Sequence, residues 1–203
     1  NFFATVFGTT LKENYYLIKD IYSQIEPFKD RPAGKLSGGM KQKLALSCAL
    51  VHKPEILFLD EPTTGVDAVS RREFWQMLKR LKEYGITIVV STPYMDEASL
   101  CDRVALISQS KLLVEDTVDQ INTKYPYPIF AVTGGKIIKV KESLLKKPFV
   151  KSVYLFGQEL HVSLEPNFGI NDLHNDISSN GFPDAIITPI VASIEDSFMM
   201  LSE

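Results

Sequence analysis

The sequence contains few cysteines and no long hydrophobic run. Cys48 and Cys101 are the only two cysteines among 203 residues, and both lie within apolar helical patterns. This placement indicates buried thiols of a cytosolic protein and argues against a disulfide framework. No apolar run approaches the roughly 18 residues that a membrane-spanning helix requires, so the sequence offers no candidate for one.

The sequence also lacks an excess of charge of one sign. Its formal net charge is −3, whereas a nucleic-acid-binding surface needs a clearly basic face. We therefore expect no nucleic-acid partner. A loose group of lysines between residues 136 and 151 is interpreted as a solvated face, with a contact to a membrane surface as the alternative. His52, His161 and His174 stand far apart, and each is expected to be a surface or packed residue rather than a ligand.

The start of the chain carries neither a methionine nor a leader pattern. Asn1 leads directly into an apolar stretch with Phe2, Phe3 and Phe7, so we expect no signal peptide and interpret the chain as a fragment or a processed product. The three aromatics are interpreted as core residues. Hydrophobic residues make up 45% of the chain, which is enough for a core in one large or two modest domains.

The first 124 residues predict helices that alternate with strands. Apolar residues recur at helical spacing in four segments: 15–25, 44–49, 74–81 and 95–101. Apolar runs predict buried strands at 56–59 and 86–90, with two further short strands at 104–107 and 112–114. In the second helical segment the expected apolar stripe is Leu44, Ala45, Cys48 and Ala49. Strand, helix and strand in this order, with continuous apolar strands, predict an α/β parallel sheet.

A change in composition at residues 125–128 predicts a domain boundary, so we expect domains at 1–124 and 128–203. The expected order beyond it is strand, helix, strand, strand, helix, strand: 129–132, 140–145, 150–156, 160–164, 170–178 and 185–187. This βαββαβ order is the split-βαβ pattern of a small ferredoxin-like α+β domain. Gly157-Gln158 is expected to turn the central hairpin, and a last helix is expected at 194–201.

The first motif with chemical meaning is Leu36-Ser37-Gly38-Gly39-Met40-Lys41-Gln42. Two glycines follow a serine N-cap and open a helix, which presents free backbone N–H groups and the positive end of the helix dipole. Without a Cβ atom a phosphate can approach the backbone closely. Alone, the motif fits an ordinary capped helix equally well.

The second motif places two consecutive carboxylates, Asp60 and Glu61, directly after the apolar strand at 56–59. Ligands bind at the carboxyl ends of strands in open α/β sheets. One carboxylate can act on Mg²⁺, and the next can position and deprotonate a water molecule. A solvated Asp-Glu turn before Pro62 is the alternative, and it would be preferred if the pair stood alone.

The two motifs are followed at once by Thr63-Thr64-Gly65-Val66-Asp67, and together they closely resemble the ABC ATPase family. The residues at positions 60–67 resemble those of its ABC-2-type exporters most. The resemblance implies that Ser37, Gly38 and Gly39 form the signature that binds the γ-phosphate of ATP held by an opposite subunit, with Gln42 in the same motif. It also implies cofactor contact through Asp67, the carboxylate of the D-loop, which communicates across the dimer.

The resemblance further implies roles for the two carboxylates after the strand. Asp60 corresponds to the Walker B aspartate that acts on Mg²⁺, and Glu61 corresponds to the catalytic base. The cofactors implied are therefore ATP and Mg²⁺. The fold implied is the later part of a P-loop-type parallel-sheet domain, a truncated half-domain that is followed here by the ferredoxin-like domain.

Two features depart from the family pattern. Pro93 stands where the family has a switch histidine, and proline offers neither a side-chain donor nor an N–H group. The printed residues contain no G-x-x-x-x-G-K-[ST] phosphate-binding loop, because Gly34-Lys35 lacks the earlier glycine and is followed by leucine. We therefore expect this chain alone to be inactive.

The sequence is interpreted as part of the ATP-hydrolysing subunit of an ABC exporter. Such a subunit would act as a dimer with a second ATPase domain and drive an integral membrane permease, at the cytoplasmic face of the inner or plasma membrane. One alternative is a degenerate nucleotide-binding or regulatory half of a tandem ABC ATPase, which Pro93 favours. Another is a soluble ABC ATPase without a transport role. It would usually carry an Asn-His-Leu-Asp D-loop region or long coiled-coil arms, and neither is found here.

Overall fold

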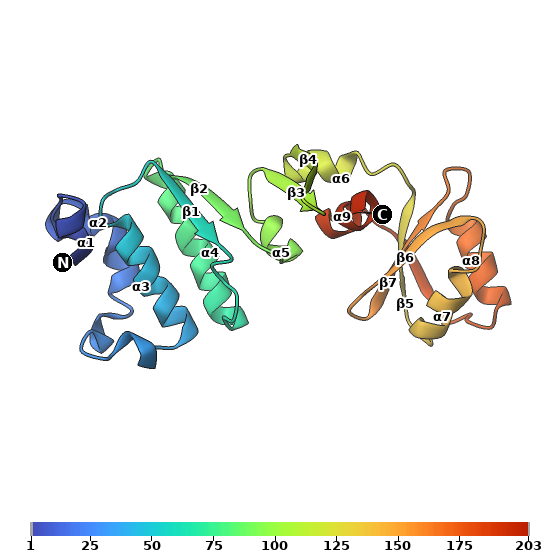
Figure 1. The fold of residues 1–203 in the computed structure, drawn as a ribbon. Coiled ribbons are helices and arrows are strands. Elements are labelled where there is room, and N and C mark those ends of the chain that lie inside the picture. Colours follow the sequence, from blue (N-terminus) through green and yellow to red (C-terminus); the bar gives the residue numbers. More distant parts are fainter. Residues whose placement is uncertain (1, 203) are drawn as a thin grey trace. The chain divides into compact units, whose positions relative to one another are not determined.

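The chain forms two compact units, the first ending at Leu100 and the second beginning at Cys101. The structure is a computed structural model that describes residues 2–202. Figure 1 labels the elements of both units. The two units are described one after the other.

The first unit contains five α-helices and two short 3₁₀ helices among its described residues. The α-helices are α1 (Phe2–Val6), α2 (Leu11–Tyr22), α3 (Gly38–Leu50), α4 (Ala68–Glu83) and α5 (Met95–Ala98). The 3₁₀ helices η1 (Glu26–Phe28) and η2 (Ala33–Lys35) follow α2. Helix α2 buries Leu17, Ile18 and Ile21 and packs against α3. Helix α4 follows β1, buries five large apolar side chains and contacts β2.

A two-stranded parallel sheet carries the centre of the first unit. Strand β1 (Ile56–Asp60) pairs with β2 (Thr87–Ser91), so that Asp60 lies opposite Ser91 at the carboxyl ends of both strands. The predicted parallel pairing is confirmed. The expectation that β1 is buried throughout is wrong: Leu57 is buried, whereas Ile56 and Phe58 are 51% and 73% exposed, because one face of the strand is uncovered by the described residues.

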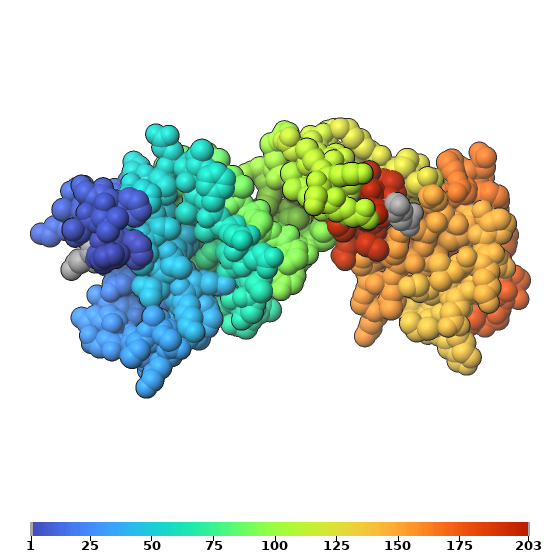
Figure 2. Space-filling model, viewed as in Figure 1, coloured from blue at the N-terminus to red at the C-terminus, as the bar shows by residue number. Residues whose placement is uncertain are grey.

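The second unit begins with an antiparallel hairpin of β3 (Val104–Ser108) and β4 (Lys111–Asp116). Helix α6 (Val118–Thr123) follows it, although the sequence predicted no helix there. The last helix, α9 (Ile194–Ser202), packs against α6. Figure 2 shows this contact where the red C-terminal segment meets the yellow-green one.

The rest of the second unit is a four-stranded antiparallel sheet with two helices. Its elements are β5 (Ile129–Thr133), α7 (Ile137–Leu144), β6 (Val150–Phe156), β7 (Glu159–Leu164), α8 (Ile170–Ser179) and β8 (Ile186–Pro189). The strand order β6-β7-β5-β8 places β7 between β5 and β6, which is the split-βαβ arrangement of a ferredoxin-like domain. The predicted element order and the turn at Gly157-Gln158 are therefore confirmed.

The core of this sheet lies between its strands and the helices α7 and α8. Val132 of β5, Val140 of α7, Leu160 of β7 and Leu173 of α8 are each 0% exposed and belong to one cluster. Alternation along β7 places Leu160, Val162 and Leu164 on the same face of the sheet. The described residues form three separate sheets, and none of them joins the two units.

Several expectations about burial were wrong. Phe2, Phe3 and Phe7 are 74%, 44% and 50% exposed rather than core residues. Helix α1 buries only Ala4 among its described side chains, and Phe7 lies in the turn after it. In α3 the buried residues are Leu46, Ser47 and Leu50 rather than the expected stripe. Apolar residues occur all around α3, so its pattern does not identify the buried face.

The cysteines and the domain boundary also differ from expectation. Cys48 and Cys101 are half-buried rather than fully buried. The chain divides into its compact units between Leu100 and Cys101, whereas the sequence predicts the domain boundary at residues 125–128. The contact of α9 with α6 explains this difference, because it joins the segment before Tyr125 to the end of the chain.

Candidate functional site

The signature residues lie at the start of α3. Ser37 is the N-cap of the helix, and its Oγ accepts a hydrogen bond from the Met40 N–H at 3.3 Å. Ser37 and Gly38 are exposed, whereas Leu36 is buried and anchors the segment that leads into the helix. The first turn of a helix leaves backbone N–H groups without partners inside the helix, so this end can accept an anion.

Asp60 lies at the carboxyl end of β1, beside the end of β2. Its Oδ1 accepts a hydrogen bond from the Ser91 hydroxyl. Its carboxylate is exposed, so its other lone pairs remain accessible. Parallel pairing of the two strands produces this contact, because the register sets Asp60 directly opposite Ser91.

Glu61 has an unusual backbone conformation. Its φ of +42° lies in the left-handed region, which is uncommon for a residue other than glycine. The Glu61 N–H donates to the Ser91 carbonyl at 3.0 Å and lies 3.1 Å from the Ser91 Oγ. The Glu61 Oε2 accepts from the Thr64 hydroxyl at 3.1 Å. Strained residues of this kind concentrate at functional sites, and here the chain turns away from the strand immediately after Asp60.

Asp67 is the N-cap of α4. Its Oδ1 accepts hydrogen bonds from the N–H groups of Val69 and Ser70 at 3.1 and 3.0 Å. These bonds, with the one from Ser70 foremost, lower the pKa of Asp67 below its ordinary value. The structure thus gives Asp67 a capping role inside the chain.

Glu97 is a buried carboxylate that the sequence interpretation missed. Only 2% of it is exposed, yet its two oxygens accept from three side chains on different segments. The Thr63 hydroxyl donates to Oε1 at 2.6 Å, the Thr92 hydroxyl donates to Oε2 at 2.7 Å, and the Arg71 Nε donates to Oε1 at 3.0 Å. Burial alone would raise the pKa of Glu97, but the two threonine hydroxyls, foremost among the opposing causes, lower it below its ordinary value.

This arrangement joins the two loops that leave the sheet. Thr63 follows β1, Thr92 follows β2, and Arg71 belongs to the first turns of α4. The Arg71 guanidinium also pairs with Asp96 at 3.0 Å and lies 4.3 Å from the centre of the Tyr94 ring. In the sequence, Glu97 is one glutamate within the predicted helix 95–101. Its distance along the chain from Thr63 and Arg71 does not identify it as their partner.

Pro93 and Gln42 lie at the edges of this site. Pro93 is exposed between Thr92 and Tyr94, so the segment after β2 presents no donor at that position. Gln42 lies in the second turn of α3, and its Oε1 is buried with no hydrogen-bond partner among the described residues. Gln42 is half-buried and follows Gly38 and Gly39 by one helical turn, so it lies on the same side of α3 with its side-chain oxygen covered.

The residues present fit ATP and Mg²⁺ only in part. Carboxylate oxygens such as those of Asp60 and Glu61 suit Mg²⁺, and the start of α3 suits a phosphate. Within residues 2–202, however, no three histidine, cysteine, aspartate or glutamate side chains lie close enough to hold a metal by themselves. The chain therefore provides some of the groups that such a site needs.

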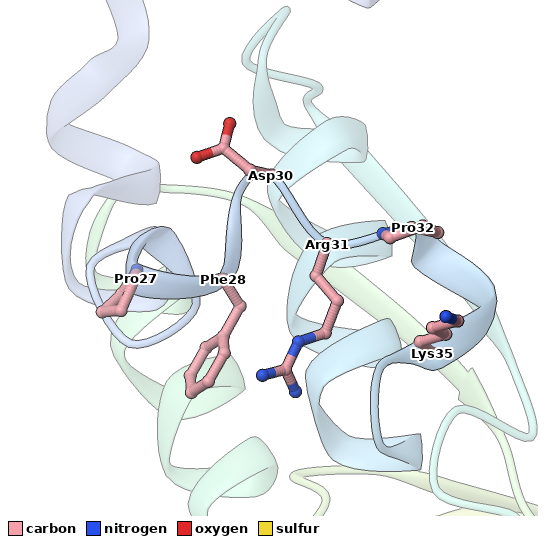
Figure 3. A pocket seen from close by; sticks show the side chains of 6 residues that line it. All are labelled: Pro27, Phe28, Asp30, Arg31, Pro32 and Lys35. Carbon is pink, nitrogen blue, oxygen red and sulfur yellow. The ribbon is translucent and has the colours of Figure 1, made fainter.

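A shallow hollow of about 470 Å³ is formed by η1, η2 and the loop between them, and neither Asp60 nor Glu61 lines it. It is lined by Pro27, Phe28, Asp30, Arg31, Pro32 and Lys35. Figure 3 shows the Phe28 ring and the Arg31 guanidinium side by side, with the Asp30 carboxylate turned away. The Arg31 Cζ lies 4.8 Å from the centre of the Phe28 ring, so the cation already has an aromatic neighbour inside the chain.

Comparison with known proteins gives one family match and many relatives. Residues 14–64 match the family described as ABC transporter. The probable multidrug ABC transporter ATP-binding protein YbhF of Escherichia coli (strain K12) is 35% identical over 201 residues, which is 97% of this chain and 34% of that protein. The Nod factor export ATP-binding protein I of Burkholderia lata is 40% identical over 162 residues, which is 78% of this chain and 53% of that protein.

The chain spans about a third of the length of the first relative and about half of the second. A solved structure titled "Structure of ATP binding subunit of ABC transporter" matches with a TM-score of 0.51 and 22% identity, over 61% of this chain and 53% of that one. At this identity the match supports the fold. No helix in residues 2–202 is long and apolar enough to cross a membrane.

Proposed function

This chain carries part of an ABC transporter ATP-binding domain, and from this premise we propose that it contributes to ATP hydrolysis in an exporter. The resemblance predicted from the motifs is thereby confirmed at the level of an ABC transporter ATP-binding protein. The finer assignment of residues is part of the proposal. One observation carries it: Asp60 and Glu61 leave β1 at the strand edge where Ser91 ends β2.

In the proposed mechanism the two carboxylates have different tasks. Mg²⁺, when bound, would neutralise charge on the phosphates, and Asp60 would hold it through its exposed carboxylate. Glu61 would accept the proton of the attacking water, a task for which a general base contributes about 10²–10⁴-fold. The bonds of its N–H group to Ser91 fix its backbone, and the Thr64 hydroxyl orients its carboxylate.

Ser37, Gly38 and Gly39 would act on a nucleotide held by a second ATPase domain. The exposure of Ser37 and Gly38 at the start of α3 supports this task, because a phosphate of another subunit can reach exposed N–H groups. Asp67 would contribute through the position of the D-loop, and we assign Gln42 the weakest role because its Oε1 is buried. The partners proposed are a second ATPase domain and a membrane permease, which would hold the protein peripherally at the cytoplasmic face of the membrane.

Calorimetric titration with Mg-ATP tests the proposal. Alone, the 203-residue chain is expected to bind ATP more weakly than about 10 µM, some 7 kcal/mol, because most of the affinity comes from a phosphate-cradling loop and its lysine. Adding an ABC ATPase domain with an intact loop and its catalytic glutamate changed to glutamine is expected to create a composite site. The chain should then raise that domain's affinity for ATP.

The dependence on Ser37 makes this experiment specific. Ser37→Ala should reduce the gain in affinity, whereas Ser179→Ala at the C-terminal end of α8, outside the motifs, should leave it unchanged. Equal effects of both variants, or no gain from the wild-type chain, would count against the proposed trans contact. Tight binding by the chain alone would reveal a phosphate site that the motifs do not include.

Pro93 supports a second candidate, a nucleotide-binding half with little turnover. Its exposed ring offers no donor where the family has a histidine. Pro93→His in an assembled, loop-containing ATPase is expected to raise the rate of hydrolysis if the donor alone is missing. An unchanged rate would favour the regulatory role, provided that ATP still binds.

A further inference from the structure

The signature glycines make close contacts inside their own chain. A Cβ atom built on Gly38 would lie 3.2 Å from the carbonyl oxygen of Gly65. A Cβ atom built on Gly39 would lie 2.9 Å from the Oγ and 3.0 Å from the Cβ of Ser70. The start of α3 therefore touches both the D-loop segment, residues 63–67, and the first turn of α4.

The two contacts differ in what they touch. Gly38 meets a backbone carbonyl, whose position depends on the left-handed conformation of Gly65, with φ +75°. Gly39 meets a side chain that belongs to the turn capped by Asp67. A Cβ on Gly39 would lie too close to the Ser70 Cβ for two non-bonded carbon atoms, so the start of α4 would have to shift. A Cβ on Gly38 would require the Gly65 carbonyl to give way by a few tenths of an ångström.

The displaced segment is connected to Glu61. Val66 N–H donates to the Thr63 carbonyl at 3.1 Å, and Thr64 N–H donates to the Glu61 carbonyl at 3.2 Å. Thr63 is in turn held by the buried Glu97. A shift at the start of α3 can thus be passed through one short turn to the carboxylate after β1.

From these contacts we infer that Gly38 and Gly39 are positioning residues within this chain. They let the signature helix pack directly on the D-loop segment and α4, so that signature and D-loop keep one fixed register. This role is separate from any contact with a phosphate of another subunit, and it does not depend on the proposed function. It predicts that substitution of these glycines changes the stability of the chain even when no nucleotide is present.

The inference is tested by whether Gly39→Ala raises or lowers the unfolding temperature. Alanine normally stabilises a helix relative to glycine, so a glycine needed only for a phosphate should tolerate alanine or gain from it. In the 203-residue chain without nucleotide we expect the opposite. Gly39→Ala should lower the unfolding temperature by about 3–8 °C and speed amide exchange at Val66, Val69 and Ser70.

A second substitution should reverse the effect. Ser70→Gly removes both atoms that a Cβ on residue 39 would meet, and the next neighbour, Val66 Cγ1, is 3.9 Å away. In the Ser70→Gly background, Gly39→Ala should therefore raise the unfolding temperature and leave exchange at Val66 unchanged. Ser70→Gly should not rescue Gly38→Ala, because that contact is with the Gly65 backbone.

Gly34→Ala is the matched control, since a Cβ there meets nothing within 4 Å, and it should leave exchange in the D-loop segment unchanged. The inference is overturned if Gly39→Ala stabilises the wild-type chain, or if it destabilises the Ser70→Gly chain equally. Should Gly39→Ala fail to fold, folding of the double variant supports the inference. Failure of the double variant, with Ser70→Gly folded, refutes it. Loss of ATP binding in the titration above would leave all these results unaffected.

Discussion

The small sheet of the first unit and the four-stranded sheet of the second unit differ in how completely they bury their apolar side chains. In the four-stranded sheet, Val132, Leu160 and Val162 are fully buried between strands and helices. In the two-stranded sheet, Phe58 and Ile56 point into solvent among the described residues. The same alternation of side chains along a strand thus has different outcomes: β5 and β7 bury most of their residues, whereas β1 leaves Ile56 and Phe58 exposed.

The carboxylates proposed for catalysis lie at the end of the two-stranded sheet, which buries fewer of its apolar side chains. Asp60 and Glu61 are exposed at the end of β1. Polar contacts with Ser91 and Thr64 position their carboxylates. Glu97 adds a buried polar junction between the loops. The comparison indicates that hydrogen bonds position the first unit's loops, whereas apolar packing stabilises the second unit's sheet.

The largest loss of stability is expected from a cavity in the four-stranded sheet of the second unit. Leu160→Ala is expected to destabilise the second unit by about 2–5 kcal/mol, because it removes a fully buried side chain. Phe58→Ala removes a larger side chain from β1 but should change the stability by less than about 0.5 kcal/mol, since Phe58 is 73% exposed. Denaturant unfolding followed by circular dichroism measures both changes.

The tryptophan fluorescence gives this test its control. The chain has one tryptophan, and Trp75 lies buried in α4 of the first unit. The fluorescence transition should remain in place for Leu160→Ala while the circular dichroism transition shifts. A cost for Phe58→Ala as large as that for Leu160→Ala would contradict the comparison.

A somewhat smaller effect is expected at the polar junction of the first unit. Glu97→Ala leaves Arg71, Thr63 and Thr92 without their shared acceptor and should cost about 2–4 kcal/mol. It should shift the fluorescence transition of Trp75 and speed amide exchange in the D-loop segment. Glu97→Gln keeps one acceptor oxygen and should have an intermediate effect.

Glu83, exposed near the end of α4, provides the matched control. Glu83→Ala should leave both the fluorescence transition and the exchange rates unchanged. If Glu97→Ala behaved like Glu83→Ala, the loops of the first unit would have to be positioned by something other than this carboxylate.

The smallest effect should be a pH dependence in the second unit. His161 of β7 bonds through Nδ1 to Asp196 of α9 at 2.8 Å and through Nε2 to Glu159 at 3.2 Å. Burial would lower the pKa of His161, but the bonds and charges of the two carboxylates raise it above its ordinary value of 6.5. Because the folded pKa is the higher one, the stabilisation is fully present below about pH 6.5. It is lost as pH rises through the folded pKa.

Asp196 sets the acid limit of the same contact. Burial would raise its pKa, yet the bonds from His161 and Ser193 lower it below its ordinary value, so its contribution is lost only as pH falls through the folded pKa. Unfolding of the wild-type chain and of His161→Asn between pH 5 and pH 9 should differ by about 1 kcal/mol at the acid end and converge at the alkaline end. His174→Asn is the control, and a constant difference across the range would contradict the assignment.

Local patterns were sufficient for much of the fold. Alternating apolar residues and the turn at Gly157-Gln158 predicted the hairpin of β6 and β7, and the element order predicted the ferredoxin-like sheet. The motifs at Ser37 and Asp60 predicted a helix start and a strand end at the right places. The burial of α3 and the exposure of α1 were not predictable in this way, because they depend on which neighbours pack against each helix.

The sequence by itself determined the motif order and the types of the elements, since both are written within short stretches of chain. Only the tertiary structure decided that Gly39 touches Ser70, that Asp60 bonds to Ser91 and that Glu97 joins Thr63, Thr92 and Arg71. All but one of these pairs lie more than twenty residues apart in the sequence. Contacts at such separations depend on strand register and helix packing, which the whole chain sets together and no local pattern encodes.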